Sequence, residues 1–218
     1  MADAFNSLLT DIRACRVCAA HLPHGARPVL QAHPDARLLI VSQAPGRRVH
    51  ASGIPFDDKS GDRLRGWLGI DHATFYDARR VAIVPMAFCY PGKNASGDLP
   101  PRRECAPLWH PRLLPRLSKI ELTLAIGGYA IAALLGARRR ATLTGTVRAW
   151  REYLNIEECG QGSPLLDPRD QGRSQKHSIM PLPHPSARNT AWFKFNPWFE
   201  TEVVPTLRDR VHKLLARD

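Results

Sequence analysis

The chain has 218 residues, 44% of them hydrophobic and 23% charged, which is typical of a globular protein and excludes a disordered or fibrous one. Its 31 Lys and Arg against 20 Asp and Glu leave a formal net charge of +11. Such a charge attracts polyanions such as nucleic acid, unless it only reflects an Arg-rich genome. The first residues lack the basic and apolar regions of a signal peptide, and no apolar run reaches the roughly 18 residues of a membrane span. We therefore expect a single cytoplasmic domain over residues 1–218.

Apolar segments and helical periodicity alternate along the chain. The pattern predicts, in order, a helix over 4–15, a strand over 37–42, a loop over 46–60, a helix over 60–68, a strand over 81–88, a Pro/Gly-rich loop over 90–101 and a helix over 104–117. It then predicts a strand over 121–126, helices over 129–135 and 146–154, a surface loop over 160–176, a strand over 178–182 and a helix over 199–217. Strands that alternate with helices indicate an α/β fold in which helices cover both faces of a parallel sheet.

Two short loops follow apolar strands about 140 residues apart. The first reads Ser-Gln-Ala-Pro-Gly over 42–46, and the second reads His-Pro-Ser over 184–186. Ligands of open α/β sheets bind at the carboxyl ends of the strands. If both strands belong to one parallel sheet, Gln43 and His184 face each other across one pocket.

The cysteines form a second pattern. Cys15 and Cys18 make a CxxC pair, and Cys89 and Cys105 flank the Pro/Gly-rich loop. Four cysteines that converge suit an iron–sulfur cluster or a tetrahedral zinc ion, and the alternative is a set of unlinked buried thiols. Cys159 stands alone and is most simply a small apolar or surface thiol.

Taken in order, these motifs resemble the uracil-DNA glycosylase superfamily, and most closely its iron–sulfur branch, known as family 4. The resemblance rests on the loop at 42–46, Gly-Ile-Pro-Phe at 53–56, Ser60-Gly61, the spacing of the four cysteines and His-Pro-Ser at 184–186. It implies a three-layer α/β/α sandwich with a central, four-stranded, mostly parallel sheet. It also implies a monomeric, monofunctional hydrolase that flips uracil out of single- or double-stranded DNA and leaves an abasic site. A structural 4Fe–4S cluster would be held by Cys15, Cys18, Cys89 and Cys105.

The resemblance also implies roles for the residues of the two loops. His184 would donate a hydrogen bond to uracil O2 as the base becomes an anion, and Phe56 would stack on the flipped base. Ser186 would anchor its loop or a phosphate, and Arg188 would contact a phosphate or a groove. The backbone of the first loop would approach the base and phosphate closely, through Ala44, Pro45 and Gly46.

Three departures from the family pattern bear on the chemistry. Gln43 replaces a glutamate and can orient water or bond the base, but it cannot act as a base. Pro85 replaces an asparagine that reads the uracil edge, which predicts looser discrimination and activity on other deaminated or oxidised bases. Asp57 is a candidate for activating water or stabilising the oxocarbenium charge. The alternative is that Asp57 and Asp58 both cap the helix that starts near Ser60.

Other residues and functions stay open at this level. Arg48 and His50 would contact phosphate or remain in solvent, and Trp192 or Phe193 would either wedge into DNA or pack in the core. One alternative function is a protein that binds uracil or abasic DNA without turnover. A second is a glycosylase of the same fold for deaminated purines. A third is a zinc-stabilised nucleic-acid-binding protein.

Overall fold

The structure is a computed structural model that describes residues 2–95, 97–154 and 178–216. Its centre is a four-stranded sheet in the order β2-β1-β5-β6, in which every neighbouring pair is parallel. The strands are β1 (Leu38–Val41), β2 (Val81–Ile83), β5 (Leu122–Ile126) and β6 (Ser178–Leu182). All their residues except Ser178 are buried, as expected for a parallel sheet covered on both faces. The predicted α/β fold with a four-stranded parallel sheet is confirmed.

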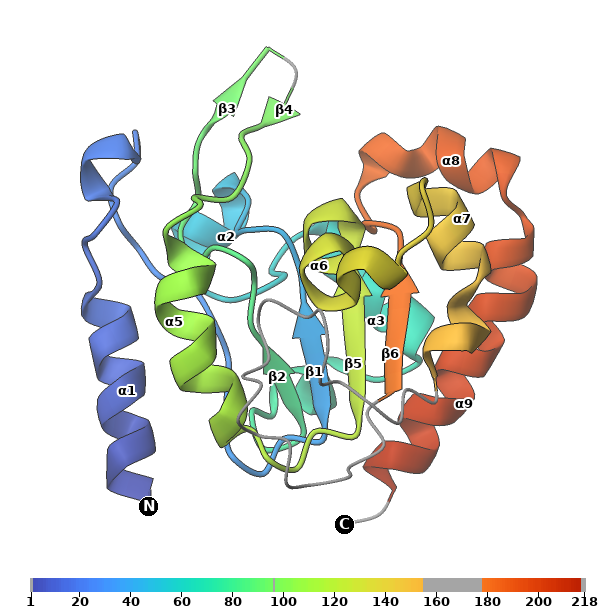
Figure 1. Ribbon diagram of the computed structural model, residues 1–218, viewed down its shortest axis with the longest axis horizontal. Helices are drawn as coiled ribbons and strands as arrows, with labels where there is room; N and C mark the ends of the chain where they lie inside the picture. Colours follow the sequence, from blue (N-terminus) through green and yellow to red (C-terminus); the bar gives the residue numbers. More distant parts are fainter. Residues whose placement is uncertain (1, 96, 155–177, 217–218) are drawn as a thin grey trace.

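Helices on both faces of the sheet complete a three-layer sandwich (Figure 1). In front of the sheet lie α5 (Cys105–Leu113), α6 (Gly127–Leu135) and α7 (Leu143–Arg148), and behind it lie α3 (Lys59–Leu68) and α9 (Val204–Leu215). The other α-helices are α1 (Ala2–Ala14), α2 (Arg47–Ser52), α4 (His72–Tyr76) and α8 (Thr190–Phe195). Among the described residues, no helix combines the length and apolar character that crossing a membrane requires.

Two segments predicted as loops contain regular structure. Within 46–60, the helix α2 forms between Gly46, which has extended backbone, and Gly53, whose φ of 77° ends the helix in the left-handed region. Within 90–101, the antiparallel strands β3 (Lys93–Asn94) and β4 (Gly97–Asp98) make a hairpin. The loop predicted over 160–176 and the thiol of Cys159 lie outside the described residues.

Prolines shorten two of the predicted elements. The strand predicted over 81–88 ends at Ile83, because Pro85 has no N–H with which to continue the ladder. The helix predicted over 104–117 ends at Leu113 and continues as a 3₁₀ turn that contains Pro115.

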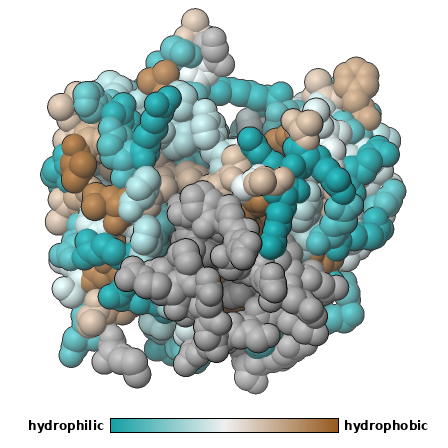
Figure 2. Space-filling model, in the orientation of Figure 1, coloured by the Kyte–Doolittle hydropathy of each residue, from teal (hydrophilic) through white to brown (hydrophobic). Residues whose placement is uncertain are grey.

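The carboxyl ends of β1 and β6 point toward one edge of the molecule. There the β3–β4 hairpin rises on one side and α8 on the other (Figure 1). Figure 2 shows hydrophilic residues over much of the upper part of this face and hydrophobic ones gathered at the left, over α1 and α5. The fold therefore leaves the loops after β1 and β6 between two raised segments.

Candidate active site

A cavity of about 270 Å³ opens at the carboxyl ends of β1 and β6. Eight of the nine residues that were predicted to catalyse the reaction or bind the substrate lie on its wall: Gln43, Ala44, Pro45, Gly46, Phe56, His184, Ser186 and Arg188. The first loop and the His-Pro-Ser loop thus share one pocket, although β5 separates their strands in the sheet. A pocket at this edge is where open α/β sheets bind ligands.

His184 is held on the cavity wall as a neutral hydrogen-bond donor. Its Nδ1 accepts a hydrogen bond from the backbone N–H of Ser186 at 3.2 Å, so the neutral ring carries its proton on Nε2. Burial is the main cause that lowers the pKa of His184 below its ordinary 6.5. Asn189 fixes the same loop by donating from Nδ2 to the His184 carbonyl at 2.8 Å. His184 can therefore offer an N–H to an oxygen in the cavity at neutral pH.

Phe56 reaches the cavity through a strained backbone. Its φ of 54° makes it the non-glycine residue with a left-handed backbone in the described part of the chain. The residue is only 8% exposed, and its ring forms an edge-to-face pair with Phe75, with centroids 6.2 Å apart. Strain of this kind persists only where the surroundings hold it, and it often accompanies a functional site.

Gly61 is the residue that allows this turn. A Cβ on Gly61 would stand 1.8 Å from the carbonyl oxygen of Phe56, which no real structure tolerates. The first turn of α3 therefore packs directly on the backbone of Phe56. This close approach explains why the Ser60-Gly61 motif has a glycine at its second position.

We expect Gly61→Ala to destabilise the fold by about 3 kcal/mol, because the added methyl group must displace backbone rather than a flexible side chain. Urea denaturation measures the change in the free energy of unfolding. Gly66→Ala in the same helix is the matched control, since a Cβ there meets nothing within 4 Å. We expect this control to be neutral or stabilising by up to about 1 kcal/mol. Equal effects of the two substitutions would contradict the account of the turn.

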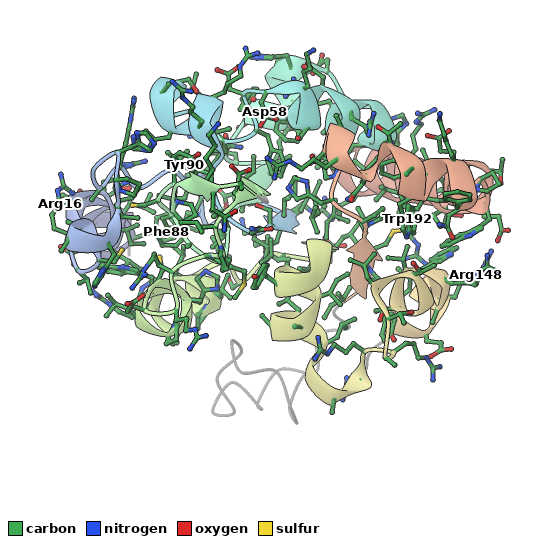
Figure 3. The ribbon with its side chains drawn as sticks, turned by 90° about the horizontal axis from the view of Figure 1, so that it is seen from above. Arg16, Asp58, Phe88, Tyr90, Arg148 and Trp192 are labelled. Atoms are coloured by element: carbon green, nitrogen blue, oxygen red, sulfur yellow. The ribbon has the colours of Figure 1, made fainter. Side chains whose placement is uncertain are left out.

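Asp58, rather than Asp57, lies on the cavity wall. Its Oδ1 accepts hydrogen bonds from the backbone N–H groups of Ser60 at 2.8 Å and Gly61 at 3.0 Å, so Asp58 is the N-cap of α3. Figure 3, which looks down on this end of the sheet, shows Asp58 at the start of that helix. The sequence-based candidate Asp57 is half-buried and lies outside the cavity lining. The capping alternative is therefore correct for Asp58.

The hairpin supplies cavity residues that the sequence analysis missed. Asp98 and Leu99 lie on the wall, and the Leu99 carbonyl accepts a hydrogen bond from Gln43 Nε2 at 3.5 Å. Arg188 Nη1, also on the wall, stands 3.7 Å from Asp98 Oδ2. A Pro/Gly-rich stretch carries no periodic signal, so the sequence did not indicate Asp98. Asn189 was also missed, although its position three residues after the His-Pro-Ser loop was a usable sign.

Pro85, which the resemblance places where the family has an asparagine, lines the cavity. Its carbonyl accepts a hydrogen bond from Nε2 of His110 at 3.0 Å. His110 is fully buried, and burial lowers its pKa to about 4. The ring is therefore neutral in the folded protein, and it joins α5 to the floor of the cavity.

The buried His110 predicts acid sensitivity. Its pKa is lower in the folded state than its ordinary 6.5, so the unfolded chain binds the extra proton more readily. The contribution of neutral His110 to the free energy of unfolding is fully present above pH 6.5. The free energy of unfolding then falls by about 3 kcal/mol as the pH drops to about 4. His110→Gln keeps an N–H for the Pro85 carbonyl and does not titrate. Urea denaturation across this pH range should show a smaller loss in the variant, and parallel curves would contradict the prediction.

Four cysteines line a second, small cavity, as the sequence pattern suggested. Cys15, Cys18, Cys89 and Cys105 are all free thiols on its wall. Burial is the main cause that raises the pKa of Cys89 to about 11 and that of Cys105 to about 12, and the charges of the neighbouring cysteines add to both. The backbone N–H of Phe88 donates to Cys105 Sγ at 3.3 Å. Within the described ranges, no three His, Cys, Asp or Glu side chains are arranged to hold a single metal ion.

One candidate phosphate contact has a structural role. His50 was expected at a phosphate or in solvent, but its ring is half-buried and its Nε2 lies 3.1 Å from the His24 carbonyl. The ring also packs near Tyr90, with centroids 6.0 Å apart. Arg48 in the same helix is exposed.

The aromatic residues after the His-Pro-Ser loop divide between core and surface. Trp192 packs edge-on against Phe199, and Phe193 packs edge-on against Trp67 and at a tilt against Phe199. Both side chains are half-buried and pack against the hydrophobic core, which favours the core alternative for this pair. Phe195, which the sequence analysis did not single out, is 84% exposed at the end of α8.

A comparison with protein families adds an independent finding. Residues 30–208 match the model of the uracil DNA glycosylase superfamily. The match includes both loops, the Phe56 turn and Arg188, and it begins after Cys15 and Cys18. A match over most of the chain leads to one conclusion. The chain belongs to the uracil DNA glycosylase superfamily.

Proposed function

We propose that this protein is a monofunctional DNA glycosylase that removes uracil from DNA by hydrolysing the N-glycosidic bond. The observation that carries the proposal is the neutral His184, whose Nε2–H shares one cavity with the strained Phe56. Superfamily membership and the net charge of +11 support a DNA substrate.

Phe56 and His184 would have different roles toward the base. A base inside a duplex must first be flipped out, after which its flat face needs a partner for stacking. Phe56 offers its ring on the cavity wall and would hold the base. As the glycosidic bond breaks, the bonding electrons pass to the base, and uracil O2 gains negative charge. The N–H of His184 would bond this oxygen more strongly in the transition state than in the ground state, which lowers the barrier.

Pro85 supports a broad base specificity. A proline side chain has no donor or acceptor, so it cannot form the paired hydrogen bonds that an asparagine forms with the uracil edge. Recognition then falls on backbone groups and on polar side chains such as Gln43. Sites that reject a substrate strongly do so by leaving buried polar groups unpaired, and a proline at this position provides none. The same observation favours a deaminated-purine glycosylase as the second candidate function.

A panel of oligonucleotides tests the proposal. Each carries one uracil, hypoxanthine, xanthine or normal base, in single- or double-stranded form, and hot alkali cleaves the abasic product. We expect cleavage at uracil, with weaker cleavage at other deaminated bases. Tight binding to uracil DNA without cleavage would instead identify a lesion-binding protein. Cleavage only at the deaminated purines would favour the second candidate.

We also propose that Cys15, Cys18, Cys89 and Cys105 hold a 4Fe–4S cluster. Four cysteine thiolates are the ligands of such clusters, and these four line one cavity. Trp109 Nε1 and Arg102 Nε are buried without hydrogen-bond partners among the described residues, and both side chains line the same cavity. These N–H groups fit an anionic, sulfur-rich group, which accepts such bonds. When bound, the cluster would tie the end of α1 to α5 and to the loop after β2, a structural role.

A further inference from the structure

We propose that Asp58 is the catalytic carboxylate that positions and activates the attacking water. This inference rests on the proposed glycosylase function and names the residue that completes its chemistry. The argument starts from the two oxygens of Asp58, which have different surroundings.

Asp58 lies on the cavity wall, and its two oxygens have different contacts. Oδ1 accepts both backbone hydrogen bonds of the α3 N-cap, which holds the carboxylate in one orientation. Oδ2 has no hydrogen-bond partner among the described residues, and it lies 3.9 Å from where a Cβ on Gly46 would stand. The carboxylate therefore reaches across to the loop after β1, at the cavity wall.

Other acidic or amide groups near the cavity are less suited to the task. The amide of Gln43 cannot take a proton, and its Nε2 is directed to the Leu99 carbonyl. Asp98 is paired with Arg188, which also lines the cavity. In the described part of the chain, Asp58 is the cavity-lining carboxylate without a cationic partner.

Asp58 and His184 line the same cavity, Asp58 from the start of α3 and His184 from the loop after β6. The charge of Asp58 partly offsets the effect of burial on the pKa of His184, so the carboxylate is within electrostatic range of the imidazole. In the transition state the base becomes an anion and the sugar becomes an oxocarbenium ion. The hydrogen bond from His184 then stabilises the base, while the negative charge of Asp58 stabilises the sugar.

The step balances with water as the only co-reactant. The C1′–N1 bond breaks, and its electron pair leaves with the base. The water oxygen forms the new bond to C1′, and one water proton passes to Asp58 Oδ2. That proton then moves to the base anion or to solvent. The products are a free base and an abasic sugar with a hydroxyl group on C1′, and Asp58 is ionised again.

Asp58→Asn separates the charge from the helix cap, because Asn is as good an N-cap as Asp. Single-turnover release from a single-uracil oligonucleotide should fall roughly 100-fold or more, in the range typical of lost general-base catalysis. The temperature of unfolding and the affinity for DNA should stay close to wild type. Asp58→Ser, which also preserves a cap, should lose as much activity and serves if the first variant is unstable. Asp62→Asn, in the first turn of the same helix and exposed, is the matched control and should release uracil at the wild-type rate.

The outcomes distinguish this inference from the function on which it rests. A folded Asp58→Asn protein within about threefold of the wild-type rate would overturn the role of Asp58 and leave the glycosylase in place. A large loss of the uracil-release rate in Asp57→Asn, with Asp58→Asn still active, would assign the role to Asp57 instead. A wild-type protein that releases no base overturns both proposals.

Discussion

His184→Ala is expected to lower the single-turnover rate of uracil release by roughly 100- to 1,000-fold, the usual cost of removing one donor to a developing oxyanion. The reason lies in the fixed tautomer. The backbone N–H of Ser186 occupies Nδ1, so the proton of the neutral ring is on Nε2. Alanine leaves the oxygen of the departing base without that donor. Binding of uracil DNA should change much less than the rate, because the hydrogen bond strengthens only as charge develops.

Two further variants sharpen this prediction. His184→Gln keeps an N–H group in a less rigid side chain and should recover part of the lost rate. His72→Ala removes an exposed histidine outside the cavity lining and should have the wild-type rate. A His184→Ala protein within about threefold of wild type would mean that the ring does not stabilise the leaving base.

Cys105→Ala is expected to abolish the iron–sulfur cluster and to lower the temperature of unfolding by about 10 °C. Cys105 begins α5, while Cys15 and Cys18 follow α1, so a bound cluster joins segments far apart in the sequence. Purified wild-type protein should be brown and contain about four iron and four sulfide per chain. The variant should be colourless and contain neither in stoichiometric amounts.

The control for this experiment is Cys159→Ala, since the resemblance leaves Cys159 out of the cluster. We expect this variant to keep its iron, its colour and its temperature of unfolding. Zinc in place of iron in the wild-type protein would favour the tetrahedral alternative. No metal in freshly prepared protein, with an unchanged unfolding temperature in Cys105→Ala, would contradict a structural cluster.

The sequence predicted which loops meet, because their meeting depends on topology. Gln43 and His184 each follow a buried apolar strand, and parallel strands bring their carboxyl ends to one edge. The four cysteines were grouped by their spacing together with the family resemblance, and they line one cavity. Both predictions depend on patterns that can be read directly from the sequence, namely the apolar strands and the spacing of the cysteines.

What the sequence could not predict depends on single backbone angles and long-range contacts. A choice between Asp57 and Asp58 requires the direction of the chain after Phe56, and there the backbone adopts a φ of 54° that is rare for a phenylalanine. Asp98 reaches the cavity through a short hairpin in a stretch without periodicity. His50 turns inward because His24 and Tyr90, distant in the sequence, provide its contacts.

The most direct test of the central claim is the identification of the products that the wild-type protein forms from a single-uracil oligonucleotide under single-turnover conditions. We predict one equivalent of free uracil and one intact DNA strand with an abasic site, which is cleaved only after hot alkali. Strand cleavage without alkali would contradict a monofunctional glycosylase. DNA that is bound and recovered with its uracil in place would contradict base removal itself.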